Sequence, residues 1–304
     1  MNRAIRIGLL FCIGMITTIT LSAQTLQEWA QTVNWDGVSH WSKYIKSSAA
    51  YMGPNALPVP FIGNGSVDSN TWIAGTGHFH FSKGDQTQNI ALYGNYPIVK
   101  DVVTIDVAYI PVEHYRMSDA VKKERHVYYT HYDSKLAKGD VYLNGTVKFM
   151  KKWEKSIQLA VRFGFRLPSS NKLEAARYTD NMGYYADLSF GRPISAHMKW
   201  IGMAGIYVWQ LTGDGHRQND AFLFGTGLEW NKNKWRVQTS MAGYLGYLLN
   251  SGDKPVVVRA HAEKKFNHAS VLLRLQQGIK DFKYSSAEAG IRIFLNRKVP
   301  ALAK

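Results

Sequence analysis

Six arginines of the chain fall at polar positions of segments in which apolar and polar side chains alternate. Alternation at period two is typical of β-strands, so we expect the guanidinium groups to share one side of a sheet. Rings of arginine on an interior surface favour anions, which makes these side chains candidates for selecting an anionic solute. They are Arg162, Arg166, Arg236, Arg259, Arg274 and Arg292.

Carboxylates on the same polar faces leave a second interpretation open. Buried charges are stable when they are paired, so an internal network of ion pairs would explain the arginines without any selection of solutes. Basic groups outnumber acidic ones on these faces, which keeps the hypothesis of anion selection alive. The acidic residues concerned are Asp106, Asp187, Glu229, Glu263 and Glu288.

Five histidines form a candidate cluster toward one end of the predicted strands. His78 and His80 share the polar face of one segment, and His114, His126 and His131 lie in or beside a long loop. Imidazole is the commonest metal ligand and titrates near neutral pH. No fixed ligand spacing such as His-x-x-x-His occurs among them, so the sequence favours ordinary surface histidines and predicts neither a metal site nor a cofactor.

A hydrolase is the rival class of function. The string Asn267-His268-Ala269-Ser270 is similar to the Asn-His-x-Ser of outer-membrane phospholipases and to the His-x-Ser of lipid A deacylases, in which histidine activates a serine nucleophile. Those phospholipases continue with Asn-Gly, whereas Ser270 is followed by Val271, and no third catalytic member can be placed. We therefore expect no enzymatic activity and assign no catalytic residue.

The elements that position these side chains are predicted to be strands. The composition, with 26 Gly, 17 Tyr, 13 Phe and 9 Trp, suits strands and tight turns better than a helical repeat. Residues 140–167 alternate most clearly, with an interruption at 151–155. Similar pairs of segments follow to residue 295, and weaker ones precede them from residue 72. The pattern predicts an all-β fold of about twelve antiparallel strands of about ten residues, long enough to span a bilayer when tilted.

The connections between these strands alternate in length. Short ones are expected at 97–101, 151–155, 191–195, 231–234 and 264–268, and longer ones at 82–88, 113–139, 168–179, 211–220, 249–254 and 279–286. In transmembrane barrels short turns face the periplasm, long loops face outward, and an even strand number returns both ends to the periplasm. The alternation therefore favours a barrel. A soluble sandwich or lipocalin-like barrel would have the same periodicity with its apolar face turned inward.

Residues 1–23 have the pattern of a signal peptide. Arg3 and Arg6 precede an apolar run at 7–21, and Ser22-Ala23-Gln24 suits cleavage after Ala23. Cleavage removes Cys12, the only cysteine, which excludes disulfides, a cysteine nucleophile and a thiolate metal site from the mature chain. The formal net charge is +15, and it becomes 35 − 22 = +13 once Arg3 and Arg6 are removed. For an exported chain this charge fits lipid phosphate or acidic solutes better than nucleic acid.

Residues 24–70 do not follow the rhythm of the strands. Leu26, Trp29, Ala30 and Val33 have helical spacing, while the Pro58-Val59-Pro60 stretch forces an extended chain. Because a barrel of this size leaves interior space, we predict a plug in the lumen or a periplasmic cap, with a partner-binding arm as the third option. The predicted organisation is a signal peptide at 1–23, this plug or cap at 24–70 and a barrel at 71–304.

Over residues 72–295 the chain resembles the outer-membrane β-barrels of Gram-negative bacteria, and the ending Leu21-Ser22-Ala23-Gln24 looks like signal peptides of the Bacteroidota. Barrels of this class often finish on a terminal aromatic residue. Here Phe294 is followed by residues 295–304, so the chain departs from the class in this respect. The resemblance implies a porin-like channel in the outer membrane for a small polar or anionic solute. The alternative is a non-conducting barrel that binds an envelope protein through residues 24–70. The expected contacts are outer-membrane lipid and a small solute, and no nucleic acid.

Overall fold

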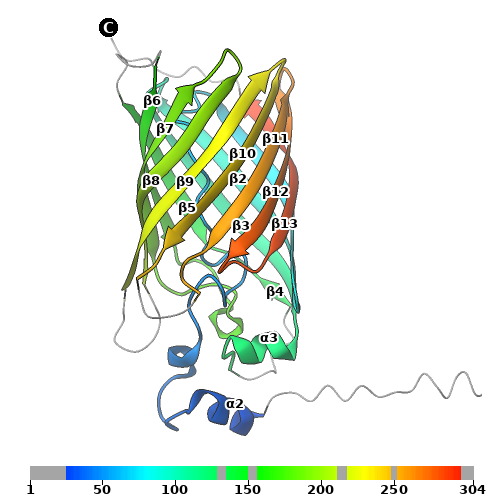
Figure 1. The fold of residues 1–304 in the computed structure, drawn as a ribbon. Coiled ribbons are helices and arrows are strands. Elements are labelled where there is room, and N and C mark those ends of the chain that lie inside the picture. The colour runs from blue at the N-terminus through cyan, green and yellow to red at the C-terminus, as the bar shows by residue number, and fades with distance from the viewer. Residues whose placement is uncertain (1–24, 129–134, 150–155, 211–217, 248–251, 296–304) are drawn as a thin grey trace, which may run out of the picture.

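The computed structural model describes residues 25–128, 135–149, 156–210, 218–247 and 252–295. Within them the chain forms an antiparallel barrel whose lumen contains an N-terminal segment (Figure 1). The alternating segments form the strands β1 (Thr71–Ser82), β2 (Asp85–Val99), β3 (Val103–Met117), β5 (Val141–Phe149), β6 (Gln158–Leu167), β7 (Gly183–Pro193), β8 (Met198–Gln210), β9 (Gln218–Lys232), β10 (Trp235–Leu245), β11 (Val256–Lys265), β12 (Ala269–Lys280) and β13 (Ser285–Leu295).

These twelve strands close the barrel, which confirms the predicted fold class and strand number. Each strand pairs with the next along the chain, and β1 pairs with β13 in a register that places Thr71 opposite Leu295. Both ends of the barrel therefore lie at the same rim. The two-residue strand β4 (Leu136–Ala137) pairs only with the end of β3.

The large apolar side chains of the strands point outward. Ile73, Leu143, Phe163, Leu228 and Ile291 are exposed on the outside of the barrel. Charged residues occupy the alternate, inward positions and are buried, among them Arg166, Asp187, Glu229, Glu263 and Arg292. An apolar exterior around a polar interior is the arrangement of a barrel in lipid, and it is the inverse of a soluble sandwich or lipocalin.

The two rims of the barrel differ in their connections. The short-turn rim carries residues 100–102, 194–197, 233–234 and 266–268, together with the start of β1 and the end of β13. The long-loop rim carries the described residues 83–84, 118–128, 135–140, 168–182, 246–247, 252–255 and 281–284, and includes the helix α3 (Asp119–Glu124). Several loop residues fall outside the described ranges, including the predicted turn at 151–155 and the loop stretch 211–217.

One predicted loop at the long-loop rim is wrong. The expected connection at 82–88 is a two-residue turn, because β1 continues to Ser82 and β2 begins at Asp85. Gly84 makes the turn possible by adopting a φ of +81°, which a side chain would oppose. Residues 85–88 belong to the strand because Asp85 and Thr87 alternate inward, where both are buried.

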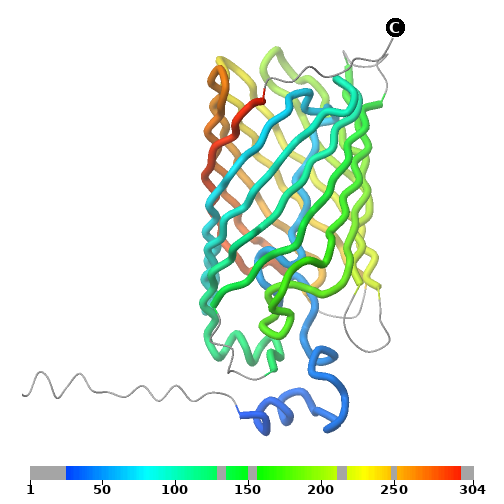
Figure 2. The backbone as a smooth tube through the Cα atoms, turned by 180° about the vertical axis from the view of Figure 1, so that it is seen from behind, coloured from blue at the N-terminus to red at the C-terminus, as the bar shows by residue number. Residues whose placement is uncertain are grey.

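The N-terminal segment has two parts, which we call the head (residues 25–46) and the threaded segment (residues 47–70). The head contains α2 (Leu26–Val33) and the short 3₁₀ helix η1 (Trp41–Tyr44). Thr25 and Glu28 form a capping box at the start of α2, which satisfies backbone groups that a helix leaves free. No helix among the described residues is long and apolar enough to span a membrane. Figure 2 shows the head beyond the long-loop rim and the chain from residue 47 running up the lumen.

Candidate functional site

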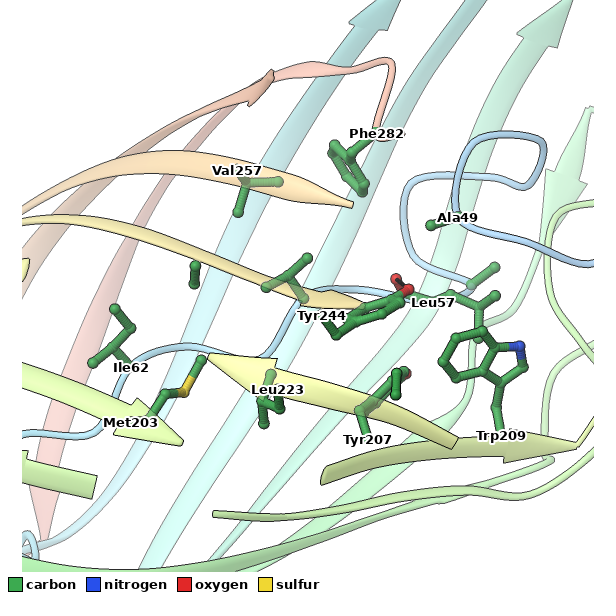
Figure 3. Close-up of a cluster of buried hydrophobic side chains, with 14 of the residues drawn as sticks. Ala49, Leu57, Ile62, Met203, Tyr207, Trp209, Leu223, Tyr244, Val257 and Phe282 are labelled. Carbon is green, nitrogen blue, oxygen red and sulfur yellow. Dashed lines mark hydrogen bonds between the residues drawn. The ribbon is translucent and has the colours of Figure 1, made fainter. Parts of the chain in front are cut away.

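The threaded segment packs its apolar side chains against one part of the barrel wall. Leu57 and Ile62 are buried in a cluster that includes Tyr207 on β8, Leu223 on β9 and Tyr244 on β10 (Figure 3). The inward positions of these strands are apolar here, although inward positions elsewhere in the barrel are mostly polar. Burying one such aliphatic side chain is worth about 1.5–3 kcal/mol. The wall is therefore shaped for this segment.

The backbone of the threaded segment is held by side chains of the wall. Arg166 donates to the carbonyl of Ala56 at 2.5 Å, and Tyr244 donates to the carbonyl of Leu57 at 3.0 Å. Arg259 donates to the carbonyls of Val59 at 2.6 Å and of Pro60 at 3.0 Å. Prolines at 54, 58 and 60 have no backbone N–H, so this extended chain cannot pair with a strand through a regular ladder of hydrogen bonds. Side-chain donors of the wall bind its carbonyl groups instead.

Beside the threaded segment the lumen contains a cavity of about 470 Å³, a volume within the range of small-molecule sites. Its lining comes from residues 54–68 and from inward side chains of every barrel strand except β9. On one side, the ring of Phe61 contacts both Arg259 and Arg274, whose guanidinium carbons are 4.5 and 4.6 Å from the ring centre. We call these three residues and the neighbouring His261 the basic side of the cavity.

Most of the six predicted arginines are paired with carboxylates. The N–O distances are 2.7 Å for Arg162 with Asp187, 2.6 Å for Arg236 with Glu229, 2.9 Å for Arg274 with Glu288, 2.9 Å for Arg292 with Glu263 and 3.8 Å for Arg166 with Asp140. The interpretation as an internal ion-pair network therefore describes these five. All six arginine side chains face the interior of the barrel, and their pairing depends on strand register.

Arg259 differs from the other five. Its hydrogen bonds go to the neutral acceptors Val59, Pro60 and Gln276, the last at 2.6 Å, and no described carboxylate lies within ion-pair distance of it. It is nearly completely buried. Nearby, His261 has a buried Nε2 without a hydrogen-bond partner among the described residues. The basic side of the cavity therefore carries a positive charge that no described acid neutralises directly.

An acidic side chain lies on another part of the cavity lining. Asp106 on β3 accepts a hydrogen bond of 2.7 Å from Asn144, whose own oxygen accepts from Tyr185 at 3.2 Å. No described cation is within ion-pair distance of Asp106. Charges of opposite sign therefore line the cavity from β3 and from β11–β12, and a field between them can orient a polar solute.

A second ionic cluster lies near the long-loop rim. Arg177, which is fully buried, donates to Glu113 at 2.8 Å and to Asp85 at 2.6 Å, and Arg125 lies 2.8 Å from Asp85. Tyr178 donates to Glu113 at 2.6 Å. We call these five residues the rim cluster. They connect the loop at 168–182 and the residue after α3 to β2 and β3.

The electrostatics of the loop residues in the rim cluster follow from burial and pairing. Burial alone would lower the pKa of Arg177, but Glu113 and Asp85 outweigh it and raise this pKa. Burial, together with Glu113, raises the pKa of the Tyr178 hydroxyl well above its usual value. Sequence reasoning missed Arg125 and Arg177 because loop residues have no periodicity that places them on a face.

The four predicted histidines that the structure describes do not lie together in one cluster. His78 and His80 point into the lumen, where His78 lies 3.3 Å from Glu288 and His80 is bonded to Asn89 and Ser286. His114 follows the inward Glu113 and so belongs to the outer face of β3, while His126 contacts the head. The strand alternation and the loop separate them, and His131 lies outside the described residues. No group of metal-ligating residues occurs in the described part of the chain.

The residues of the hydrolase-like string are arranged differently from a catalytic pair. Ser270 is completely buried and donates to Glu263 at 2.6 Å, and this carboxylate also binds Arg292 at 2.9 Å. His268 precedes β12 in the turn at 266–268, and no hydrogen bond joins it to Ser270 among the described contacts. Ser270 thus stabilises an ion pair of the wall, whereas a nucleophile needs a base within hydrogen-bonding reach.

No protein-family model and no curated protein matches the sequence. Solved structures are similar in fold. An outer membrane channel from Pseudomonas putida F1 has a TM-score of 0.56 at 8% identity, over 78% of this chain and 99% of that one. The NanC porin has a TM-score of 0.50 at 6% identity, over 73% of this chain and 100% of that one. The chain therefore has the fold of a bacterial outer-membrane β-barrel.

Proposed function

We propose that the protein resides in the bacterial outer membrane and conducts a small polar solute that carries an anionic group. The observation that carries this proposal is Arg259, a buried guanidinium that lines the cavity without a carboxylate partner among the described residues. A buried charge left without a counter-charge attracts a mobile ion of opposite sign. Apolar residues around the outside of the barrel support the location in lipid.

The cavity lining supports a route through the lumen that favours one orientation of the solute. An anionic group is attracted to the basic side, where Arg259 and Arg274 both contact Phe61. Asp106 repels the same group from β3 and attracts the positive end of a dipolar solute. Because the pairing of the other arginines cancels most of their charge, selectivity depends on a few residues.

Conductance across planar bilayers tests this proposal. We expect the full-length protein, or a variant without residues 25–66, to give currents whose reversal potential in a KCl gradient favours chloride. Arg259→Gln should shift the reversal potential toward potassium, and Asp106→Asn should shift it the other way. Arg192→Gln is the matched control, because this exposed arginine near the short-turn rim does not line the cavity. Equal reversal potentials in the parent protein and in its three substituted variants would contradict the proposal.

The absence of current from both the full-length and the truncated protein would favour a different function, a closed barrel that binds an envelope partner. The rim cluster motivates this alternative, since its buried ion pairs fasten the loop at 168–182 to β2 and β3 at the long-loop rim. Co-purification of an envelope protein that is lost when residues 25–66 are removed would support it. We propose no enzymatic activity, because Ser270 is buried against Glu263.

A further inference from the structure

The threaded segment crosses the lumen from one rim to the other. Its contacts with the wall follow the chain in order, so residues with lower numbers meet the wall closer to the long-loop rim. From the short-turn rim onward, the hydrogen bonds join Asp68 to Trp72, Asn64 to Glu229, Pro60 and Val59 to Arg259, Leu57 to Tyr244, Ala56 to Arg166, Met52 to Tyr284 and Ala50 to Gly252.

The head lies beyond the long-loop rim, next to α3 (Figures 1 and 2). The amide of Lys46 donates to the carbonyl of Arg125 at 3.2 Å, and the indole of Trp29 donates to the carbonyl of His126 at 3.1 Å. The Trp29 ring also contacts Tyr44 and Tyr128, with centroids 5.7 and 4.7 Å apart. These contacts join the head to the loop that follows α3, and they place it at the opposite end of the barrel from the start of β1.

The orientation of the barrel follows from its connections. In barrels with an even number of strands, the short turns and both ends of the barrel face the periplasm, and the longer loops face the outside. Thr71 and Leu295 are opposite each other at the short-turn rim, where the connections at 233–234 and 266–268 are two and three residues long. The long-loop rim, and with it the head, is then on the outer surface.

A signal peptide delivers a chain to the periplasm, which is the side where β1 begins. The head can reach the opposite rim only through the lumen. We propose that this barrel exports its own N-terminal segment, so that residues 25–46 fold on the outer surface of the cell while residues 47–70 remain in the lumen. The extended, proline-containing threaded segment fits such a passage, since it forms no helix or strand that would have to unfold.

The fit of the threaded segment indicates a defined final position. A Cβ on Gly63 would lie 2.7 Å from the Cβ of Ser189, and a Cβ on Gly65 would lie 2.1 Å from the carbonyl oxygen of Gln158. Only glycine allows the backbone to approach the wall so closely at these two positions. The segment therefore stops at one register, with the head fully outside, and this arrangement does not depend on whether the barrel conducts a solute.

Labelling of single cysteines on intact cells tests the export of the head. Cleavage of the predicted signal peptide leaves a chain without cysteine, so the wild type provides the background. Val38→Cys reports on the head, where this side chain is 90% exposed. Lys123→Cys in α3 marks the long-loop rim and His197→Cys marks the short-turn rim, both at exposed positions. The reagent is a membrane-impermeant maleimide, and heat-modifiable migration verifies that each variant is folded.

We expect Val38→Cys and Lys123→Cys to be labelled at similar rates on intact cells, and His197→Cys to be labelled only after the outer membrane is permeabilised. Labelling of Lys123→Cys but not of Val38→Cys would show that the head remains in the periplasm. Labelling of His197→Cys alone would show that the barrel has the opposite orientation. Either result overturns the proposal, and neither depends on the conductance measurements.

Discussion

Among the glycines of the threaded segment, Gly65 leaves the least room for a side chain. Its φ is +71°, and an added Cβ would meet the carbonyl oxygen of Gln158 at 2.1 Å and the amide of Gly191 at 2.8 Å. The neighbouring Asn64 donates to Glu229 at 3.2 Å, which connects this contact to a buried ion pair with Arg236. A single glycine thus determines how the segment sits near the short-turn rim.

Gly65→Ala should release this part of the threaded segment while the barrel still forms. The left-handed backbone costs an alanine about 1–2 kcal/mol, and the clash with Gln158 adds to that cost. Gly37→Ala is the control, because Gly37 also has a positive φ, +80°, but nothing lies within 4 Å of the added Cβ. Hydrogen exchange of residues 58–68 in detergent should rise in Gly65→Ala only. Equal exchange in both variants would refute the importance of the close contact.

Arg259 shows how one residue can differ in role from residues of the same type and pattern. Five arginines at inward positions face carboxylates across or along the sheet. Arg259 binds instead the backbone of the threaded segment. Arg259 therefore has two roles. It binds the threaded segment to the wall, and it places a positive charge at the cavity.

At the scale of elements, the head is attached to the barrel through the loop after α3. The backbone carbonyl of His126, whose φ is +58°, accepts a hydrogen bond from the indole N–H of Trp29. The Nδ1 atom of His126 lies 3.0 Å from the carbonyl oxygen of Tyr44. Burial lowers the pKa of this histidine, and the nearby Lys46 lowers it further. The attachment therefore favours the neutral imidazole, which donates from Nδ1 to the carbonyl.

We predict that the head loosens as the pH falls. The pKa of His126 is lower in the docked state than its usual value of about 6.5. The contribution of the neutral His126 to docking of the head is therefore complete above about pH 6.5. It is lost as the pH falls from there toward the pKa of the docked state, because only the released histidine takes up a proton. Hydrogen exchange of residues 26–46, corrected for the intrinsic effect of pH, should increase as the pH is lowered from about 7.5 to about 5.

His126→Asn is the matched control for this pH dependence. Asparagine tolerates the left-handed backbone, can donate to the Tyr44 carbonyl and does not titrate. The head of this variant should show the same corrected exchange at both pH values. An acid-induced increase that persists in His126→Asn would assign the effect to another group.

At the scale of the whole molecule, the barrel has an apolar outside and a charged inside. Leucine, isoleucine and phenylalanine side chains are exposed on the outer face of the strands. The inner face of the same strands carries buried charged side chains, among them Asp187, Glu229 and Glu263. Water cannot cover such an exterior favourably, whereas lipid or detergent can. The closed sheet leaves no free edge between β1 and β13, so backbone groups are satisfied within the barrel.

The mature protein should accordingly require detergent and resist unfolding in it. We expect circular dichroism typical of strands, and a compact band on a detergent gel that shifts when the sample is boiled. The boiled sample of the same preparation serves as the unfolded reference. A water-soluble monomer rich in helix, obtained after removal of residues 1–23, would contradict the barrel in lipid.

The barrel can be predicted from the sequence because each strand depends on a local property. Alternation at period two in segments such as 158–167 decides which side chains share a face, and connection lengths decide how the strands reverse. The same reasoning predicted six arginines on the polar face of the strands and a separate plug or cap at residues 24–70. It misjudged the connection at 82–88, where polar residues of β2 looked like a loop although they point into a polar lumen.

The pairing of the charges and the position of the N-terminal segment follow only from the folded barrel. Pairing requires the register between strands, as for Arg274 with Glu288, and residues far apart in the chain must meet, as for Arg177 with Glu113. Arg259 stands apart only because the carbonyls of Val59 and Pro60 reach it through the lumen. Such contacts depend on the closure of the whole sheet around the threaded segment, and no local pattern encodes a distance across a lumen.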